Sequence, residues 1–166
     1  MTKEQYKRLA SPFLKHKSLA RLLICVDQGI TALVFLSYPI LLCALLLRAD
    51  YGKLVSCIWV PGLSFAAVSL FRRCYSAKRP YEVWDIQPLI EKDTKGKSFP
   101  SRHIFSVYMI GMTYYFVLRP VGILIGILGI VMAYARVAGG VHFPRDVAVG
   151  ALAGILCGLA YCVLGG

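Results

Sequence analysis

The chain has 166 residues, of which 58% are hydrophobic and 16% are charged, and its mean hydropathy is +0.65. Ordinary soluble domains are roughly 45–50% apolar and about 25% charged, so this composition excludes a free soluble globule and indicates one integral membrane domain over residues 1–166. The net charge is +11. In a membrane protein this excess favours anionic lipid headgroups or phosphorylated substrates as partners, and we expect no nucleic-acid partner.

The first 22 residues mix basic and apolar side chains, among them Lys3, Lys7, Leu9 and Phe13. This pattern is compatible with a basic helix that lies in the membrane interface and is broken near Pro12. A frayed basic tail is the alternative that the sequence leaves open.

Five uncharged runs follow, and each is a candidate for a membrane-spanning helix. A span needs about 20 largely apolar residues, and shorter runs suffice when their flanks reach the interface. The sequence therefore predicts an all-α fold, a polytopic membrane helix bundle with five transmembrane helices and an N-terminal interfacial helix. The predicted spans are 30–47, 54–71, 104–118, 120–135 and 147–166.

Glycines recur every four residues in the last two predicted spans. They are Gly122 and Gly126 in one span, and Gly150, Gly154 and Gly158 in the other. Such spacing predicts close packing of helix backbones.

The polar segment 72–102 is the long connection of the chain and holds eight of its 19 Lys and Arg residues. A long loop on a small membrane protein is more often functional than idle. With five alternating spans, this loop and the connection 136–146 lie on the same side of the membrane. Three clusters of polar residues are therefore expected to meet there.

Arg72 and Arg79 form the first cluster. Seven residues separate them, close to two turns if the helix persists, and Pro80 is expected to end it. Both guanidinium groups could then bind one anion. The alternative is a basic helix end whose side chains reach the lipid headgroups.

Pro100, Ser101, Arg102 and His103 form the second cluster, directly before an apolar helix. Ser101 suits the N-cap position, and His103 falls in the first turn. The free N–H groups and the positive end of the helix dipole favour an anion there, beside a histidine that can donate a proton.

Arg136, His142 and Asp146 form the third and most specific cluster. Pro144 disfavours a helix at Phe143, so His142 precedes the last helix while Asp146 lies in its first turn. The carboxylate can then reach back to the imidazole, fix its tautomer and leave the other ring nitrogen as a nucleophile or base. The alternative is that Asp146 merely caps the helix.

Together the three clusters resemble the type 2 phosphatidic acid phosphatase superfamily of integral membrane lipid phosphatases. The family pattern is Lys-x6-Arg-Pro, Pro-Ser-Gly-His and Ser-Arg-x5-His-x3-Asp. This chain matches it in order and spacing with Arg72-x6-Arg79-Pro80, Pro100-Ser101-Arg102-His103 and Ala135-Arg136-x5-His142-x3-Asp146. Arg72, Arg102 and Ala135 depart from the pattern, replacing Lys, Gly and Ser, but the nucleophile, acid and orienting carboxylate remain.

The resemblance implies a role for each matching residue. His142 would be a nucleophile that forms a phosphohistidine, Asp146 would orient it, and His103 would protonate the leaving oxygen. The expected phosphate-binding residues are Arg72, Arg79, Ser101, Arg102 and Arg136. No metal and no cofactor are expected.

These roles imply a metal-independent phosphatase that acts on a membrane lipid phosphate or diphosphate. Undecaprenyl diphosphate is favoured because the chain is compact and Arg102 suits a second phosphate; phosphatidylglycerol phosphate and phosphatidic acid are the other candidates. A phosphotransferase using the same histidine and a non-catalytic lipid-binding protein are the alternatives. The oligomeric state is left open.

Two arguments disagree on which side of a bacterial cell membrane the site faces. Sixteen of the 19 Lys and Arg residues fall on the side of the motifs, so the positive-inside rule favours the cytoplasm. The resemblance implies an outward-facing site, as is usual in bacterial members of the family. We favour the outward orientation, because function constrains the site more directly than charge bias does.

Overall fold

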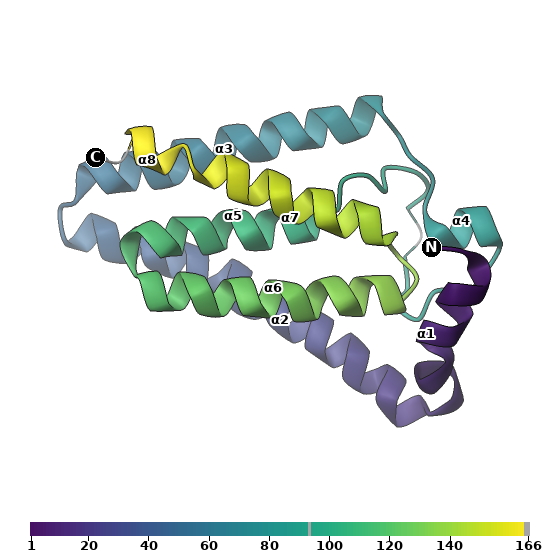
Figure 1. Cartoon of the computed structure of the whole chain (residues 1–166). Coiled ribbons are helices and arrows are strands. Elements are labelled where there is room, and N and C mark those ends of the chain that lie inside the picture. The colour runs from purple at the N-terminus through teal and green to yellow at the C-terminus, as the bar shows by residue number, and fades with distance from the viewer. Residues whose placement is uncertain (93, 165–166) are drawn as a thin grey trace.

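The computed structural model describes residues 1–92 and 94–164 (Figure 1). All regular secondary structure in these residues is helical, so the predicted all-α class is confirmed. The helices are α1 (Lys3–Lys15), α2 (Lys17–Leu47), α3 (Tyr51–Cys74), α4 (Pro80–Trp84), α5 (Arg102–Val117), α6 (Arg119–Ala138), α7 (Pro144–Gly158) and α8 (Tyr161–Leu164).

Three of these helices, α2, α3 and α6, are long and apolar enough to cross a membrane. In contrast, α5 has 16 residues and α7 has 15, which is short of the roughly 20 residues that a span needs. The predicted count of five spans is therefore not confirmed. Of the two short helices, α5 lies inside the bundle and packs against both α6 and α7, whereas α7 buries one face and exposes Leu152 and Leu156 on the other.

The first helix forms, but it does not break where the sequence predicted. Thr2 caps α1 by accepting a hydrogen bond from the Gln5 backbone N–H, and the Gln5 side chain accepts one from the Thr2 N–H in return. Pro12 lies inside α1, and the break comes at His16. A proline so close to the C-terminal end of a helix removes one N–H donor without preventing one more turn.

One end of the bundle gathers the segments that carry the motifs. Figure 1 shows the C-terminal ends of α3 and α6 beside the N-terminal ends of α2, α5 and α7, with α1 and α4 next to them. The α2–α3 and α5–α6 turns lie at the opposite end. The expected convergence of the loop 72–102 with the 136–146 connection is therefore what the fold produces.

Glycines let α5 approach α6 and α7 closely, as predicted, with one exception. A Cβ atom at Gly150 of α7 would lie 2.7 Å from the Ser101 carbonyl oxygen, and one at Gly122 of α6 would lie 2.4 Å from the Tyr115 backbone nitrogen. Gly126 faces open space, with nothing within 4 Å of the same position. The expectation of close packing is therefore wrong for Gly126: it is one turn beyond Gly122 on the same side of α6, but no neighbouring helix approaches it there.

Candidate active site

The two arginines of the first cluster do not share a helix. Helix α3 ends at Cys74, and Arg79 is the N-cap residue of α4. Pro80 begins α4 instead of ending α3, because its fixed φ suits the first position of a helix and its missing N–H is not needed there. The two arginines approach the site from different elements.

The Arg72 guanidinium is buried against the segment that precedes α5. It donates a hydrogen bond to the Ser98 carbonyl at 3.2 Å and further bonds to the carbonyls of Lys97 and Pro100. Arg72 thus fixes the course of the chain directly before Ser101.

Arg79 connects the same segment to the turn between α6 and α7. Its Nε donates to the Gly96 carbonyl at 3.1 Å, and its Nη1 donates to the Val141 carbonyl at 3.2 Å. Glu82 supports this arrangement, because its carboxylate accepts hydrogen bonds from the backbone N–H groups of both Arg79 and Gly96. Burial lowers the pKa of the Arg79 guanidinium from its usual value.

His142 lies in the turn between α6 and α7 and is 1% exposed. Its Nδ1 is 3.6 Å from Asp146 Oδ2 and 3.4 Å from the Ser98 hydroxyl, which itself donates to Asp146 Oδ2 at 2.5 Å. Ser98 therefore bridges the histidine and the carboxylate. Burial lowers the pKa of His142 to about 4, although Asp146 opposes the shift. The imidazole is then neutral at pH 7.

Asp146 also performs the capping role that the sequence left as an alternative. Its Oδ2 accepts a hydrogen bond from the Phe143 backbone N–H at 3.0 Å at the start of α7. Its carbonyl oxygen accepts one from the Ser101 N–H at 2.8 Å. The backbone of α7 is thus bonded directly to the N-cap residue of α5, and this contact joins the second and third clusters.

Ser101 is the N-cap residue of α5, but its hydroxyl caps nothing. Its Oγ is fully buried and has no hydrogen-bond partner among the described residues. Buried hydroxyl groups are usually hydrogen-bonded. The hydroxyl is therefore available to a ligand.

Arg102 and His103 lie where the polar site meets an apolar one. The Arg102 side chain is exposed, with its guanidinium 5.5 Å from the centre of the Phe65 ring. The His103 ring lies 6.5 Å from that of Phe35. These four residues and Ser106 line a cavity of about 110 Å³.

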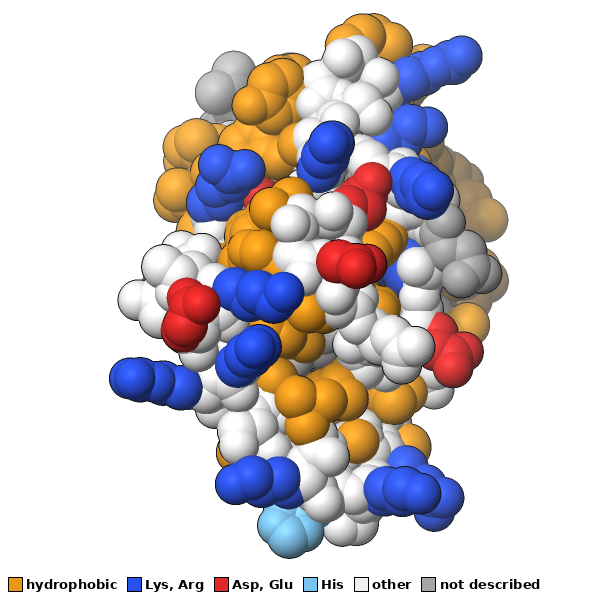
Figure 2. Space-filling model, turned by 90° about the vertical axis from the view of Figure 1, so that its right-hand side faces the viewer, with side chains coloured by type: hydrophobic (Ala, Val, Ile, Leu, Met, Phe, Trp, Pro, Cys, Tyr) orange, Lys and Arg blue, Asp and Glu red, His pale blue; other side chains and the backbone are white. Residues whose placement is uncertain are grey.

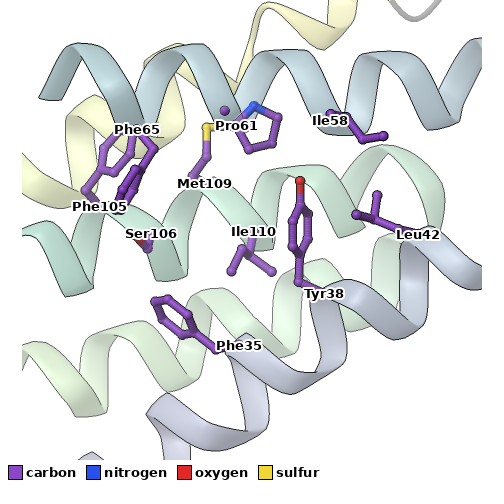
Figure 3. Close-up of a pocket in the computed structure, with 11 residues that line it drawn as sticks. Phe35, Tyr38, Leu42, Ile58, Pro61, Phe65, Phe105, Ser106, Met109 and Ile110 are labelled. Carbon is purple, nitrogen blue, oxygen red and sulfur yellow. The ribbon is translucent and has the colours of Figure 1, made fainter. Parts of the chain in front are cut away.

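A larger cavity of about 330 Å³ continues from this point between α2, α3 and α5. Phe35, Phe65 and Ser106 line both cavities. Figure 3 shows the apolar side chains that the three helices contribute, with Tyr38 and Met109 deeper along the cavity. An apolar groove therefore leads away from His103 between α2, α3 and α5, and two of these helices, α2 and α3, are long and apolar enough to cross a membrane.

Arg136 has an ion-pair partner that the sequence analysis missed. Its Nε donates to Asp27 Oδ1 of α2 at 2.7 Å, and both side chains are about 95% buried, with exposed fractions of 5% and 4%. The available signal was a single carboxylate in an otherwise apolar helix, which is costly in a membrane unless it is paired. Asp27 is therefore, beside Asp146, a second buried carboxylate at the site end of the bundle.

Two further residues were missed. Ser98 carried no signal, because nothing in its sequence position distinguishes it from other loop serines. Lys92 is half-buried and interacts electrostatically with four arginines of the predicted site: Arg72, Arg79, Arg102 and Arg136. Burial, followed by these charges, lowers the pKa of Lys92 to about 8.

The end of the bundle that carries the site is rich in positive charge. Figure 2 shows this face, with Lys and Arg side chains spread over it and fewer Asp and Glu side chains among them. A positive surface concentrates anionic lipid headgroups and phosphate compounds near the site.

Comparison with known proteins identifies the family. The family model of the PAP2 superfamily matches residues 53–165, and the chain belongs to this superfamily. The resemblance seen in the sequence is thus confirmed, and the chain is a multi-pass membrane protein of a family of phosphatases that act on phosphate esters.

One curated relative is the bacitracin transport permease protein BcrC of Bacillus licheniformis, 36% identical over 75 residues. This match covers 45% of the chain and only 36% of that relative.

Two solved structures share the fold. LpxE of Aquifex aeolicus superposes with a TM-score of 0.74 at 23% identity, over 96% of this chain and 93% of that one. The first transmembrane PAP2 type phosphatidylglycerolphosphate phosphatase from Bacillus subtilis gives 0.60 at 20% identity, over 96% and 92%. Identities this low support the fold alone.

Proposed function

We propose that the chain hydrolyses the terminal phosphate of a membrane lipid phosphate or diphosphate. The observation that carries this proposal is the arrangement around His142: a buried imidazole whose Nδ1 faces Ser98 and Asp146, in a basic site that adjoins an apolar groove. A phosphate headgroup fits the basic part, and a lipid tail fits the groove.

The proposed reaction has two steps. In the first, Nε2 of His142 attacks phosphorus, the bond to the leaving oxygen breaks, and His103 gives that oxygen a proton. Burial and nearby positive charges lower the pKa of His103, so in this proposal His103 takes up the proton when the negatively charged phosphate binds beside it. In the second, His103 takes a proton from water, the resulting hydroxide attacks the phosphohistidine, and the N–P bond breaks to release inorganic phosphate. The low pKa of His142 supports its role, because the nucleophile must be unprotonated.

The proposed phosphate ligands are Arg72, Arg79, Ser101, Arg102 and Arg136. Charge develops on the phosphoryl oxygens in the transition state, and fixed N–H donors stabilise it. The unpartnered hydroxyl of Ser101 supports its part in this set. Because the nucleophile and the acid are both histidines, we propose that no metal ion takes part, so activity should persist in excess chelator and vanadate should inhibit.

We favour undecaprenyl diphosphate over phosphatidylglycerol phosphate and phosphatidic acid. In a diphosphate, the second phosphate lies between the reacting phosphate and the tail. We assign Arg102 to this second phosphate, because its side chain is exposed beside Phe65 at the mouth of the groove.

The deciding experiment is a phosphate-release assay of the purified protein on these three lipids, with and without an added lipid alcohol as acceptor. Release without acceptor supports the phosphatase. Transfer only to the acceptor would favour the phosphotransferase, and binding without turnover of any lipid would favour a lipid-binding protein.

We further propose that the site faces outward across a bacterial cell membrane. The test is Lys95→Cys in a cysteine-free variant, treated in intact cells with an impermeant thiol reagent. Labelling of intact cells supports the outward orientation, whereas protection until lysis would show a cytoplasmic site.

A further inference from the structure

Asp27 is a buried carboxylate that the proposed reaction does not use. It is the only acidic residue of α2, an apolar helix of 31 residues, and is 3% exposed. A charge at such a position is costly unless it is paired, and intramembrane carboxylates often serve function.

The contact with Arg136 uses only one edge of the guanidinium. The Nε–H donates to Asp27 Oδ1, and neither Nη group of Arg136 donates a hydrogen bond to any described residue. A guanidinium is planar and carries its donors in a fixed fork. A carboxylate bound at Nε therefore fixes the direction in which both Nη groups point.

Arg136 is close to the proposed nucleophile along the chain and in space. Its carbonyl oxygen accepts a hydrogen bond from the Val141 N–H at 3.2 Å, immediately before His142. It also interacts electrostatically with both His103 and His142. The Arg136 side chain, with its free Nη edge, therefore lies within electrostatic range of both histidines.

We propose that Asp27 is a positioning residue that holds Arg136 with its Nη groups directed at the phosphate. This inference rests on the proposed function and adds to it a residue from outside the family match, which begins at residue 53. The part of the chain that carries the three motifs is then incomplete without α2.

A structural role alone would also explain the pair, because it joins α2 to α6. The two explanations differ in a double-mutant cycle on lipid phosphate hydrolysis. If Asp27 acts through Arg136, Asp27→Asn should lower kcat about 10- to 100-fold with a small change in KM, and Asp27→Glu should restore part of it. In the Arg136→Ala background, Asp27→Asn should then have no further effect on kcat.

The exposed pair Asp50–Lys53 supplies a matched control, because Asp50→Asn removes one carboxylate far from the site. Unfolding temperature is measured for every variant. Equal kcat for wild type and Asp27→Asn, or a loss from Asp27→Asn that is the same with and without Arg136, would overturn the inference.

A binding measurement keeps the inference separate from the proposed function. Vanadate should raise the unfolding temperature of wild type and Asp50→Asn, and raise it clearly less in Asp27→Asn and Asp27→Glu. Should wild type release no phosphate from any lipid, the proposed function fails, and this binding series alone decides the role of Asp27. Equal vanadate shifts in all variants would reject it.

Discussion

The ion pairs at the two ends of the bundle differ in their exposure to solvent. At the far end, Asp50 and Lys53 pair at 2.9 Å with exposed fractions of 36% and 51%, one helical turn apart. At the site end, Asp27 and Arg136 pair at 2.7 Å with both side chains almost fully buried. A surface pair contributes about 0–1 kcal/mol, whereas breaking a buried pair costs about 3–5 kcal/mol because a bare charge remains.

The buried charges at the site end need an explanation other than stability. A buried pair is often no more stabilising than an apolar contact of the same size, so stability alone does not account for it. Arginines 72, 79 and 136 are all at most 7% exposed at one end. Such a concentration is expected where a bound anion completes the charge balance.

The largest expected effect at the site end is that of His142→Ala. If His142 is the nucleophile, turnover of a lipid phosphate should fall at least about 10⁴-fold, while vesicle binding and the unfolding temperature change little. The measurement is the initial rate of phosphate release beside a flotation assay. Turnover near the wild-type rate would remove His142 from the mechanism.

His103→Ala should have the next largest effect, about 10²- to 10⁴-fold for a lipid monophosphate. An activated aryl phosphate has a good leaving group and needs less proton donation, so its rate should fall less. Initial rates on the two substrates test this difference. An equal loss on both would indicate that His103 does not act as the acid.

Acid pH should act on the site end through His142. Because its pKa is about 4, the neutral nucleophile persists at pH 6, and the rate should fall about tenfold per pH unit below pH 4. In the unfolded chain the His142 imidazole has its ordinary pKa of 6.5. The unfolded state therefore binds a proton more readily than the folded state, and the free energy of unfolding decreases as the pH falls from 6.5 to 4. The measurements are the turnover rate and the free energy of unfolding as functions of pH. His142→Asn should make the free energy of unfolding depend less on pH in this range.

The close packing of α5 against α7 can be tested by substituting two glycines, one at the contact and one away from it. Gly150→Ala forces a Cβ against the Ser101 carbonyl, and overpacking of this kind costs about 1–3 kcal/mol. Gly126→Ala meets open space and should instead stabilise α6 by up to about 1 kcal/mol. Denaturation midpoints compare the two variants. Equal destabilisation by both would contradict the close approach of α5 and α7.

The smallest effect should come from Asp50→Asn at the far end. An exposed pair predicts a change in unfolding free energy below about 1 kcal/mol and no change in turnover. A strong loss of activity in Asp50→Asn would contradict the view that only the site end carries functional charges.

The sequence predicted that most of the proposed site residues would lie together, because its motifs are local. Asp146 reaches His142 across one turn of chain, and Ser101 starts α5, so spacing was sufficient. Asp27 was not predictable in the same way, since its partner lies 109 residues away. Ser98 joins His142 and Asp146 only after the loop has folded.

Helix ends and lengths were predicted less well. Arg72 and Arg79 would share a helix only if it persisted to Pro80, but α3 ends at Cys74. The Arg72 side chain bonds instead to carbonyl groups of the loop before α5. Hydropathy alone also predicted that α5 and α7 span the membrane. Burial of most of α5 inside the bundle explains why this short helix can be apolar on most sides.

The backbone contacts of Arg72 and Arg79 have a consequence for the cost of binding. A guanidinium has five N–H donors. Arg72 directs three of them at described carbonyls and Arg79 directs two. Both side chains are therefore ordered before a phosphate arrives, with donors to spare. The rotamer entropy that free arginines would lose on binding has already been lost during folding, so an incoming anion keeps more of its interaction energy as affinity.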